Sequence, residues 1–390
     1  MIKSITNNQQ SLLRGLTAGL FALMLAVFAM PAQAQMDDGE LPSIDVSANL
    51  MQSAQYISLS TDNSDPVAGF HRVRAGINAN VQFAEGVSGL VMVEQEPNDF
   101  GGQYAPAVDF AILNVQATPQ LTVQAGTPVT GLLNFRGYSD GPVVQSNPLI
   151  GNSPTDFITA GQGVKLIGSY DTFGFDATVA KGFSGTLTGT DGSNTGLQLI
   201  GKARYTGSDM FKVGAGVAVA TGKQSLLFTG GDGNNYALSS GVGSDPGGAY
   251  VGTPSQLNAI RNTHANIPGQ TAFHGDAKIM VGGADVDVWA GYGSDSDADA
   301  SAILGGLGVK FDVNDSFYVA GRFSAVSDQS DGAPDSSTLT RIQAGVGYYI
   351  ADNALLKVEG VNQSHGDSGL TRPAPADSFS GVLTELSFNF

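Results

Sequence analysis

The chain has 390 residues, a formal net charge of −17 at pH 7 and no cysteine. The negative balance argues against nucleic acid as a partner, because phosphate backbones are bound by clusters of Lys and Arg, and the lack of cysteine excludes a disulfide framework. Although Gly accounts for 53 residues, the 42% hydrophobic content and long alternating runs argue against disorder.

Residues 1–34 are predicted to be a cleavable signal peptide. Lys3 and Arg14 are the only charged residues of this segment, and residues 16–30 form an apolar run. Ala32-Gln33-Ala34 then matches the small-residue cleavage pattern. The run is too short for a typical membrane-spanning helix, so an uncleaved anchor is disfavoured. We expect export and cleavage after Ala34, which leaves residues 35–390 as one domain.

Apolar and polar residues alternate along most of the remaining chain, as in Val73 to Phe83 and in Val286 to Tyr292. A strand places alternate side chains on opposite faces, so each segment has one apolar and one polar face. Sixteen strands are predicted, most of about the 9–11 residues that a tilted membrane strand needs. They are 48–59, 70–83, 88–95, 108–116, 121–126, 162–170, 173–183, 196–205, 211–220, 271–281, 285–293, 302–311, 316–325, 338–350, 354–363 and 378–390.

The predicted connections alternate between short turns and long loops. The short connections are 84–87, 117–120, 171–172, 206–210, 282–284, 312–315 and 351–353, and the long ones include 127–161, 221–270 and 294–301. This alternation is typical of an all-β, transmembrane antiparallel β-barrel with short periplasmic turns and long extracellular loops. Aromatic residues lie beside the turns, as an interfacial girdle requires. Residues 223–228 and 249–251 leave open an added hairpin, which would give 18 strands.

The last strand carries Val382, Leu386, Phe388 and Phe390 on one face, and Glu385 lies on the other. With the signal peptide, the sixteen strands and the loop pattern, this ending resembles the Gram-negative general porins over residues 48–390. The resemblance implies an outer-membrane protein that contacts lipid and lipopolysaccharide and forms homotrimers. It also implies that Leu386, Phe388 and Phe390 are read by the barrel-assembly machinery, and that small hydrophilic solutes and ions diffuse passively through the pore.

The resemblance further implies that the loop after the fifth strand, 127–161, folds into the pore. This loop contains apolar residues such as Leu132, Phe135 and Ile150, which should pack against the inside of the barrel. It lacks the Pro-Glu-Phe-Gly-Gly motif of the enterobacterial porins, so details of the constriction do not transfer.

Almost all Lys and Arg residues of the predicted strands occupy the polar set of alternating positions, here called the polar phase. In a membrane barrel this set of side chains faces the lumen. Eleven cations and seven acids share this phase, so we expect a basic wall and a mild anion preference. Opposed charges at Arg72 and Arg74 and at Asp140 and Asp156 would form a constriction, although the two acids also fit as turn residues. The predicted pore-lining and constriction residues are Arg72, Arg74, Arg136, Asp140, Asp156, Lys165, Lys202, Arg204, Lys278, Arg322, Arg341 and Lys357.

Other function classes have weaker support. Gly366-Asp367-Ser368-Gly369 after His365 resembles a serine-protease segment, but no positioned base or orienting residue accompanies it. Asp295, Asp297 and Asp299 lack the glycine and glutamate of a calcium loop. No catalytic residue, metal or cofactor is therefore predicted. The alternative function is a substrate-specific channel or a surface-recognition barrel that uses loop 221–270.

Overall fold

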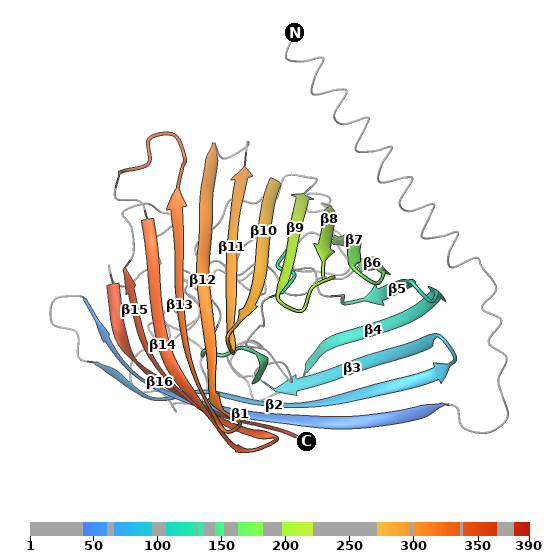
Figure 1. The fold of residues 1–390 in the computed structure, drawn as a ribbon, viewed down its shortest axis with the longest axis horizontal. Helices are drawn as coiled ribbons and strands as arrows, with labels where there is room; N and C mark the ends of the chain where they lie inside the picture. Colours follow the sequence, from blue (N-terminus) through green and yellow to red (C-terminus); the bar gives the residue numbers. More distant parts are fainter. Residues whose placement is uncertain are drawn as a thin grey trace, which may run out of the picture.

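A closed antiparallel barrel of sixteen strands forms the whole described structure (Figure 1). The computed structural model describes residues 42–60, 66–95, 107–128, 132–135, 145–151, 163–181, 197–220, 271–295, 299–335, 338–364 and 378–390. The strands are β1 (Ser43–Leu59), β2 (Val67–Ala84), β3 (Val87–Gln95), β4 (Ala107–Thr118), β5 (Leu121–Gly126), β6 (Gly163–Ser169), β7 (Phe173–Lys181), β8 (Leu197–Tyr205), β9 (Phe211–Ala220), β10 (Thr271–Val281), β11 (Ala284–Asp295), β12 (Ala300–Asn314), β13 (Phe317–Asp328), β14 (Thr338–Ala351), β15 (Ala354–Ser364) and β16 (Ser378–Asn389).

All sixteen predicted strands are confirmed, with small changes at their ends. β1 begins at Ser43 rather than at residue 48. The 18-strand alternative is wrong, because β9 pairs directly with β10 from Ala218↔Ala272 onward and leaves no place for a hairpin between them. The loop predicted at 294–301 is also too long: Asp295 pairs with Ala300, so the connection is only 296–299.

Closure of the barrel depends on β1 and β16, which are antiparallel and pair from Asn49↔Asn389 to Leu59↔Phe379. Ala48 and Phe390 complete this seam, since each backbone N–H donates to the other's carbonyl at 2.9 Å. Every strand therefore has two neighbours. A closed barrel has no sheet edge, which is the condition for strands to lie in hydrocarbon.

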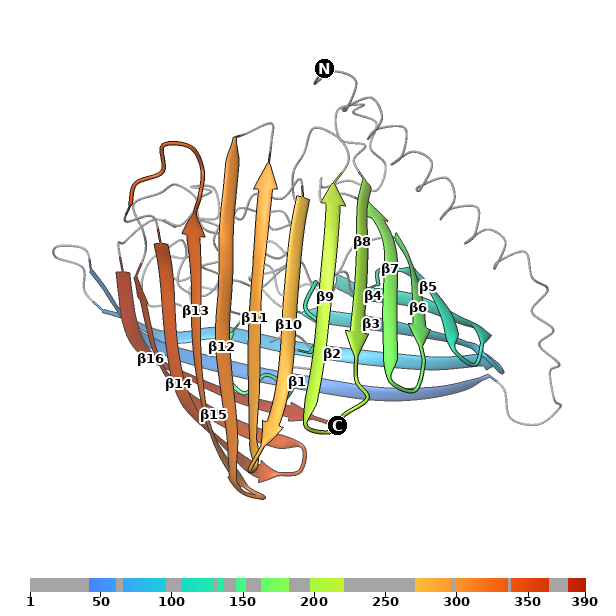
Figure 2. The same cartoon turned by 45° about the horizontal axis from the view of Figure 1, so that its top comes forward.

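Strands on opposite walls cross at a steep angle. In Figures 1 and 2, β1–β4 run across the molecule, whereas β9–β13 stand upright. Strands of a closed barrel are tilted to its axis, so front and back walls cross in projection. The short connections, such as those at residues 85–86, 119–120 and 282–283, lie at one rim with the C-terminus.

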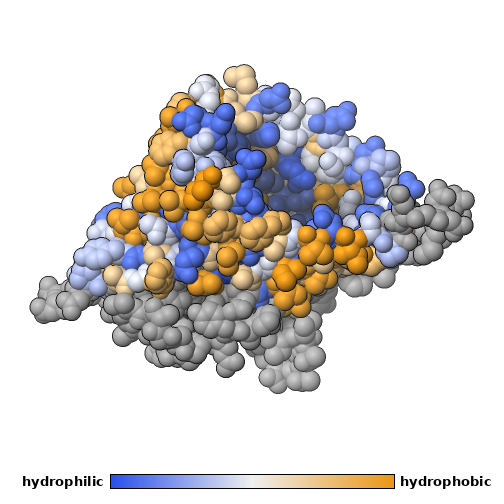
Figure 3. Space-filling view, turned by 90° about the horizontal axis from the view of Figure 1, so that it is seen from below, coloured by the Kyte–Doolittle hydropathy of each residue, from blue (hydrophilic) through white to orange (hydrophobic). Residues whose placement is uncertain are grey.

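The polarity of the barrel is the reverse of that of a soluble protein. Large apolar side chains are exposed on the outward phase, for example Phe70, Phe273 and Ile342, each more than half exposed. Buried polar side chains occupy the inward phase, among them Asn49, Gln343 and Gln363. Figure 3 shows wide hydrophobic areas on the outer surface beside a hollow lined by hydrophilic residues. An apolar outer surface of this extent fits a lipid environment.

Exposed aromatic side chains lie next to the turn rim, as the sequence predicted. They are Phe83, Phe173, Tyr205, Phe211, Phe311 and Tyr348. At the end of β16 the rings of Phe388 and Phe390 stack with centroids 6.5 Å apart. Aromatic rings in this position suit the boundary between lipid and water. Among the residues that the structure describes, no helix is long and apolar enough to cross a membrane.

One inward ion pair lies next to the closing seam, and its effect on stability can be measured. Lys357 Nζ on β15 lies 2.9 Å from Glu385 Oε1 on β16, and the two side chains are only 1% and 2% exposed. Breaking one partner of a buried ion pair typically costs about 3–5 kcal/mol. We expect Lys357→Met to lower the free energy of unfolding by about 3 kcal/mol, and Lys357→Met with Glu385→Leu to recover most of this loss.

Lys310→Met is the matched control, because its pair with Asp312 is far more exposed, at 25% and 55%. Exposed pairs contribute only about 0–1 kcal/mol. Urea unfolding of the detergent-solubilised protein measures the free energy of unfolding of the two single variants and of the double variant. Equal losses for Lys357→Met and Lys310→Met would contradict a stabilising role for the buried pair.

Candidate functional site: the barrel lumen and its inward loop

The lumenal wall of β1–β3 carries the first charged group. Arg74 on β2 is buried and its Nε donates to Glu94 Oε2 on β3. Asn49 on β1 donates to the same carboxylate. The positive charge of Arg74 is therefore neutralised within the wall. Arg72, the second predicted cation of this strand, lies opposite Ser53 in the register.

A denser group of charges lies on β6–β8. Asp176 on β7 accepts from Arg204 Nη1 at 2.9 Å and lies 3.5 Å from Lys202 Nζ, both on β8. Lys165 on β6 is buried nearby and interacts electrostatically with all three. Three cations thus lie around one carboxylate, which leaves a positive excess at this part of the wall.

The wall of β13–β16 is held by polar chains between strands. Arg322 Nε on β13 donates to Gln343 Oε1 on β14 at 2.8 Å. Arg341 on β14 donates to Gln363 on β15, and its guanidinium lies 5.9 Å from the ring centroid of Phe379 on β16. Both arginines are buried. Their side chains tie neighbouring strands together across the lumenal face.

The loop after β5 enters the barrel and binds the wall at two places. The first contact is residues 132–135. Asp276 on β10 accepts three hydrogen bonds from this segment, from the backbone N of Asn134 at 2.7 Å, from its Nδ2 at 2.8 Å and from the backbone N of Phe135 at 3.0 Å. Lys202 donates to the carbonyl of Leu133 at 3.3 Å. A carboxylate that accepts backbone N–H groups makes strong charge-assisted bonds.

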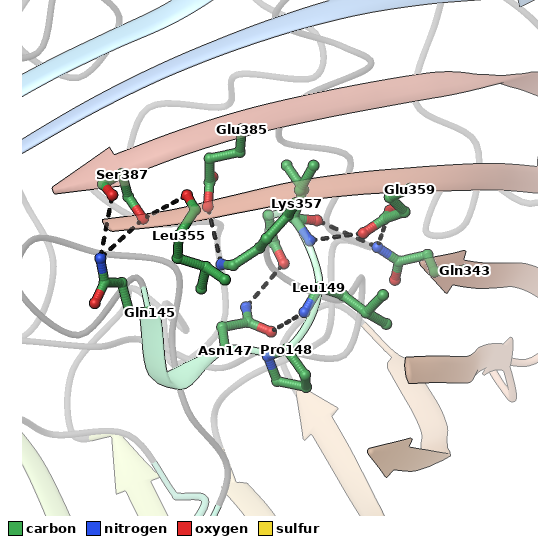
Figure 4. Close-up of polar contacts among 12 residues, drawn as sticks. Gln145, Asn147, Pro148, Leu149, Gln343, Leu355, Lys357, Glu359, Glu385 and Ser387 are labelled. Carbon is green, nitrogen blue, oxygen red and sulfur yellow. Dashed lines mark hydrogen bonds and ion pairs between the residues drawn. The ribbon is translucent and has the colours of Figure 1, made fainter. Parts of the chain in front are cut away.

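The second contact is residues 145–151, which lie against the wall of β13–β16 (Figure 4). Glu359 on β15 accepts from the backbone N of Ile150 at 2.6 Å and from Gln343 Nε2 at 2.7 Å. Arg322 donates to the carbonyl of Gly151 at 3.0 Å, and Tyr318 donates to that of Pro148 at 3.1 Å.

Gln145 begins this second contact beside the turn rim. Its Nε2 reaches the carbonyls of Asn353 and Ser387, each at 3.2 Å. Leu149 is buried against Tyr318 and Leu355. The described segments of the loop therefore contact the inner wall at β8–β10 and at β13–β16, and the predicted inward folding of 127–161 is confirmed for these segments.

Glycines in the wall make room for the loop. A Cβ on Gly214 of β9 would overlap the Asn134 side chain, and one on Gly216 would lie 3.1 Å from Leu132 Cδ2. On β14, a Cβ on Gly345 would lie 3.1 Å from Leu149 Cδ2. A contact of this kind forces a neighbour to move. The close approach of the loop thus depends on missing side chains as well as on hydrogen bonds.

A cavity of about 320 Å³ lies between the two loop contacts and the wall of β10–β13. Asn134 and Phe135 line one side, and residues 146–149 line another. Lys278 of the wall pairs with Asp285 at 2.9 Å, and the two side chains are 25% and 36% exposed. The cavity therefore presents charged groups that water reaches.

The structure places the predicted pore residues in three groups. Arg74, Lys165, Lys202, Arg204, Lys278, Arg322, Arg341 and Lys357 all lie on the inward phase of their strands. Arg72 lies in β2, but its side chain is outside the described part. Arg136, Asp140 and Asp156 lie outside the described residues, as do the signal peptide 1–34, loop 221–270 and the segment from His365 to Gly369.

Asp276 and Glu359 are two of the seven acids that the strand pattern places on the lumenal face, but sequence reasoning missed that they bind the loop. The available signal was the apolar content of 127–161, which indicated a packed loop without naming its partners. Within the described ranges, no group of three His, Cys, Asp or Glu side chains is placed to hold a metal ion.

The glycine contacts predict that Gly214→Ala displaces the loop. The added methyl group overlaps Asn134 and breaks its bonds to Asp276. Overpacking of this kind typically costs about 1–3 kcal/mol, which weakens the attachment of the loop to the wall. We therefore expect the loop to move and the single-channel current to fluctuate between levels. Gly275→Ala is the control, since its Cβ would meet no atom closer than 3.9 Å. Steady and equal currents from both variants would contradict this role of Gly214.

Comparison with known proteins supports the architecture. No protein-family model and no curated protein matches the chain. The fold is similar to that of Salmonella typhi OmpF in complex with daunomycin, with a TM-score of 0.58 and 12% identity over 90% of this chain and 98% of that one. It is also similar to an anion-selective porin from Comamonas acidovorans (TM-score 0.56, 10% identity, 90% and 100% covered) and to OmpT, an outer membrane protein of Vibrio cholerae (0.56, 15%, 92% and 100%). At these identities the likeness concerns the fold alone: the chain has a porin-like barrel.

Proposed function

We propose that the protein is an outer-membrane porin of a Gram-negative bacterium, a water-filled channel for passive diffusion of small hydrophilic solutes and ions. The observation that carries this proposal is the loop bound inside a polar lumen through Asp276 and Glu359. A loop bound to the inner wall would narrow the lumen, and a narrowed polar lumen suits a diffusion pore. The porin-like fold agrees with the proposal.

The narrowest part of the pore is proposed to combine the cations of the wall with loop residues Arg136, Asp140 and Asp156. Opposed charges there would orient polar solutes and set ion preference. Ion pairs such as Arg74–Glu94 and Lys357–Glu385 neutralise much of the wall. The group of Lys165, Lys202 and Arg204 around Asp176 keeps a positive excess, and this supports a mild anion preference.

Reversal potential in a KCl gradient tests the ion preference. We expect a modest preference for chloride in the parental protein, because the lumen retains net positive charge at β6–β8. Lys165→Gln removes one of these cations and should shift the reversal potential toward potassium. Lys310→Gln, which removes an exposed cation paired with Asp312, should shift it less. Strong potassium preference in the parental channel would contradict the proposal.

The range of solutes that pass through the barrel tests whether it is a general pore. The alternative is a substrate-specific channel or a surface-recognition barrel that uses loop 221–270. In liposomes, general diffusion gives swelling rates that fall smoothly with sugar size. A single strongly preferred solute would favour the specific channel, and absence of conductance would favour recognition. Small solutes and ions are the proposed partners in the pore, and no cofactor is required.

A homotrimer in contact with lipid and lipopolysaccharide is proposed as the assembled form, built by the barrel-assembly machinery through Leu386, Phe388 and Phe390. The outward faces of β2–β4 carry small residues such as Ala79 and Gly89 between larger ones such as Phe70 and Phe83, and we place the subunit interface there. Gly89→Trp should weaken the oligomer on unboiled electrophoresis, whereas Gly201→Trp on the outer face of β8 should not. Unchanged migration of Gly89→Trp would argue against this placement.

A further inference from the structure

The cavity behind the loop contains a balanced set of four charged side chains. Lys278 on β10 lies opposite Asp287 on β11, and Asp285 on β11 lies opposite Lys310 on β12. All four line the cavity of about 320 Å³. Two positive and two negative groups therefore share one small space, and neither sign is in excess among them.

Three of these four charges remain accessible to a solute. The side chains of Lys278 and Lys310 are both 25% exposed, and Asp285 is 36% exposed. Arg322 also lines the cavity, but its guanidinium is buried and already donates to Gln343 and to the carbonyl of Gly151. The accessible groups are thus Lys278, Asp285 and Lys310, which lie on three neighbouring strands.

A glycine leaves the space between these charges open. Gly308 on β12 lies opposite Asp287 on β11 and Arg322 on β13. A Cβ on Gly308 would lie 3.8 Å from both Asp287 Cβ and Trp289 Cζ3, so the position accepts a methyl group without a clash. A molecule above Gly308 would therefore contact Asp287 and the edge of the Trp289 ring, in the same cavity that Lys278, Asp285 and Lys310 line.

We propose that this cavity binds a small zwitterion, such as a free amino acid, as it passes through the lumen. A solute of one sign would gain attraction from one pair of groups and repulsion from the other, so its net gain is small. A solute that carries both signs satisfies lysines and aspartates together. This inference rests on the proposed diffusion function, because it names a solute class that would be retained in the pore.

Trp289 makes the proposal testable, since it is the only tryptophan of the chain and lines the cavity. We would titrate the detergent-solubilised protein with L-serine and follow tryptophan fluorescence. Three analogues of similar or smaller size are the comparison probes: glycerate lacks the ammonium group, ethanolamine lacks the carboxylate and glycerol lacks both. We expect a saturable change with serine at a half-saturation on the order of 10 mM, because exposed charge contacts are individually weak.

Each analogue that lacks a charge should bind about five-fold more weakly than serine, the factor expected for one exposed charge contact. Equal responses to serine, glycerate and ethanolamine, or none to serine, would overturn the proposal. This comparison uses the parental protein and does not depend on any variant.

Two substitutions at Gly308 locate the site. Gly308→Met fills the cavity and should abolish the response to serine, whereas Gly308→Ala should keep it. Lys310→Gln should weaken serine binding about five-fold and leave ethanolamine unchanged. A serine response that survives Gly308→Met would place binding elsewhere and overturn the assignment.

Single-channel conductance in KCl separates this inference from the proposed function. A conducting parental channel without a serine response would overturn the zwitterion site and leave the porin proposal standing. A serine response without conductance would overturn the porin proposal and retain the binding site.

Discussion

The pairing of β1 with β16 is the interaction on which the rest of the structure depends. In hydrocarbon every backbone N–H and C=O must find a partner within the protein, and an open sheet cannot meet this requirement. The seam from Asn49↔Asn389 to Leu59↔Phe379, completed by the reciprocal bonds of Ala48 and Phe390, removes both sheet edges. Closure in turn divides each strand into a lipid face and a lumenal face.

The lumenal face then has to satisfy many polar groups in little space, and the inward loop is part of that solution. Asp276 and Glu359 are acids in the wall whose hydrogen-bonding partners include backbone N–H groups of the loop. Wall glycines at Gly214 and Gly345 let the loop approach closely. The described segments of the loop are consequently held by the same polar face that the barrel requires.

Pairing also changes how the charge of the lumen should be understood. A count of the cations and acids at the lumenal positions of the strands predicts a basic wall. The pairing of neighbouring strands, however, brings most of these charges into contact with a charge of opposite sign. Arg74 meets Glu94 and Lys357 meets Glu385, so their fields largely cancel. The positive excess is concentrated at β6–β8, and the balanced charges at β10–β12 surround a cavity instead. Selectivity therefore depends on local groups of residues more than on the total charge of the wall.

The sequence by itself determined the sixteen strands and their lipid and lumenal faces, because a two-residue period and turn spacing are local properties of the chain. The inward folding of loop 127–161 was expected from the resemblance to porins and from the apolar residues of the loop. The sequence did not determine the partners of the lumenal charges. Asn134 and Asp276 are 142 residues apart, and Ile150 and Glu359 are 209 apart. Only the tertiary structure decided these contacts, since strand register and the path of the loop across the lumen set which distant residues meet.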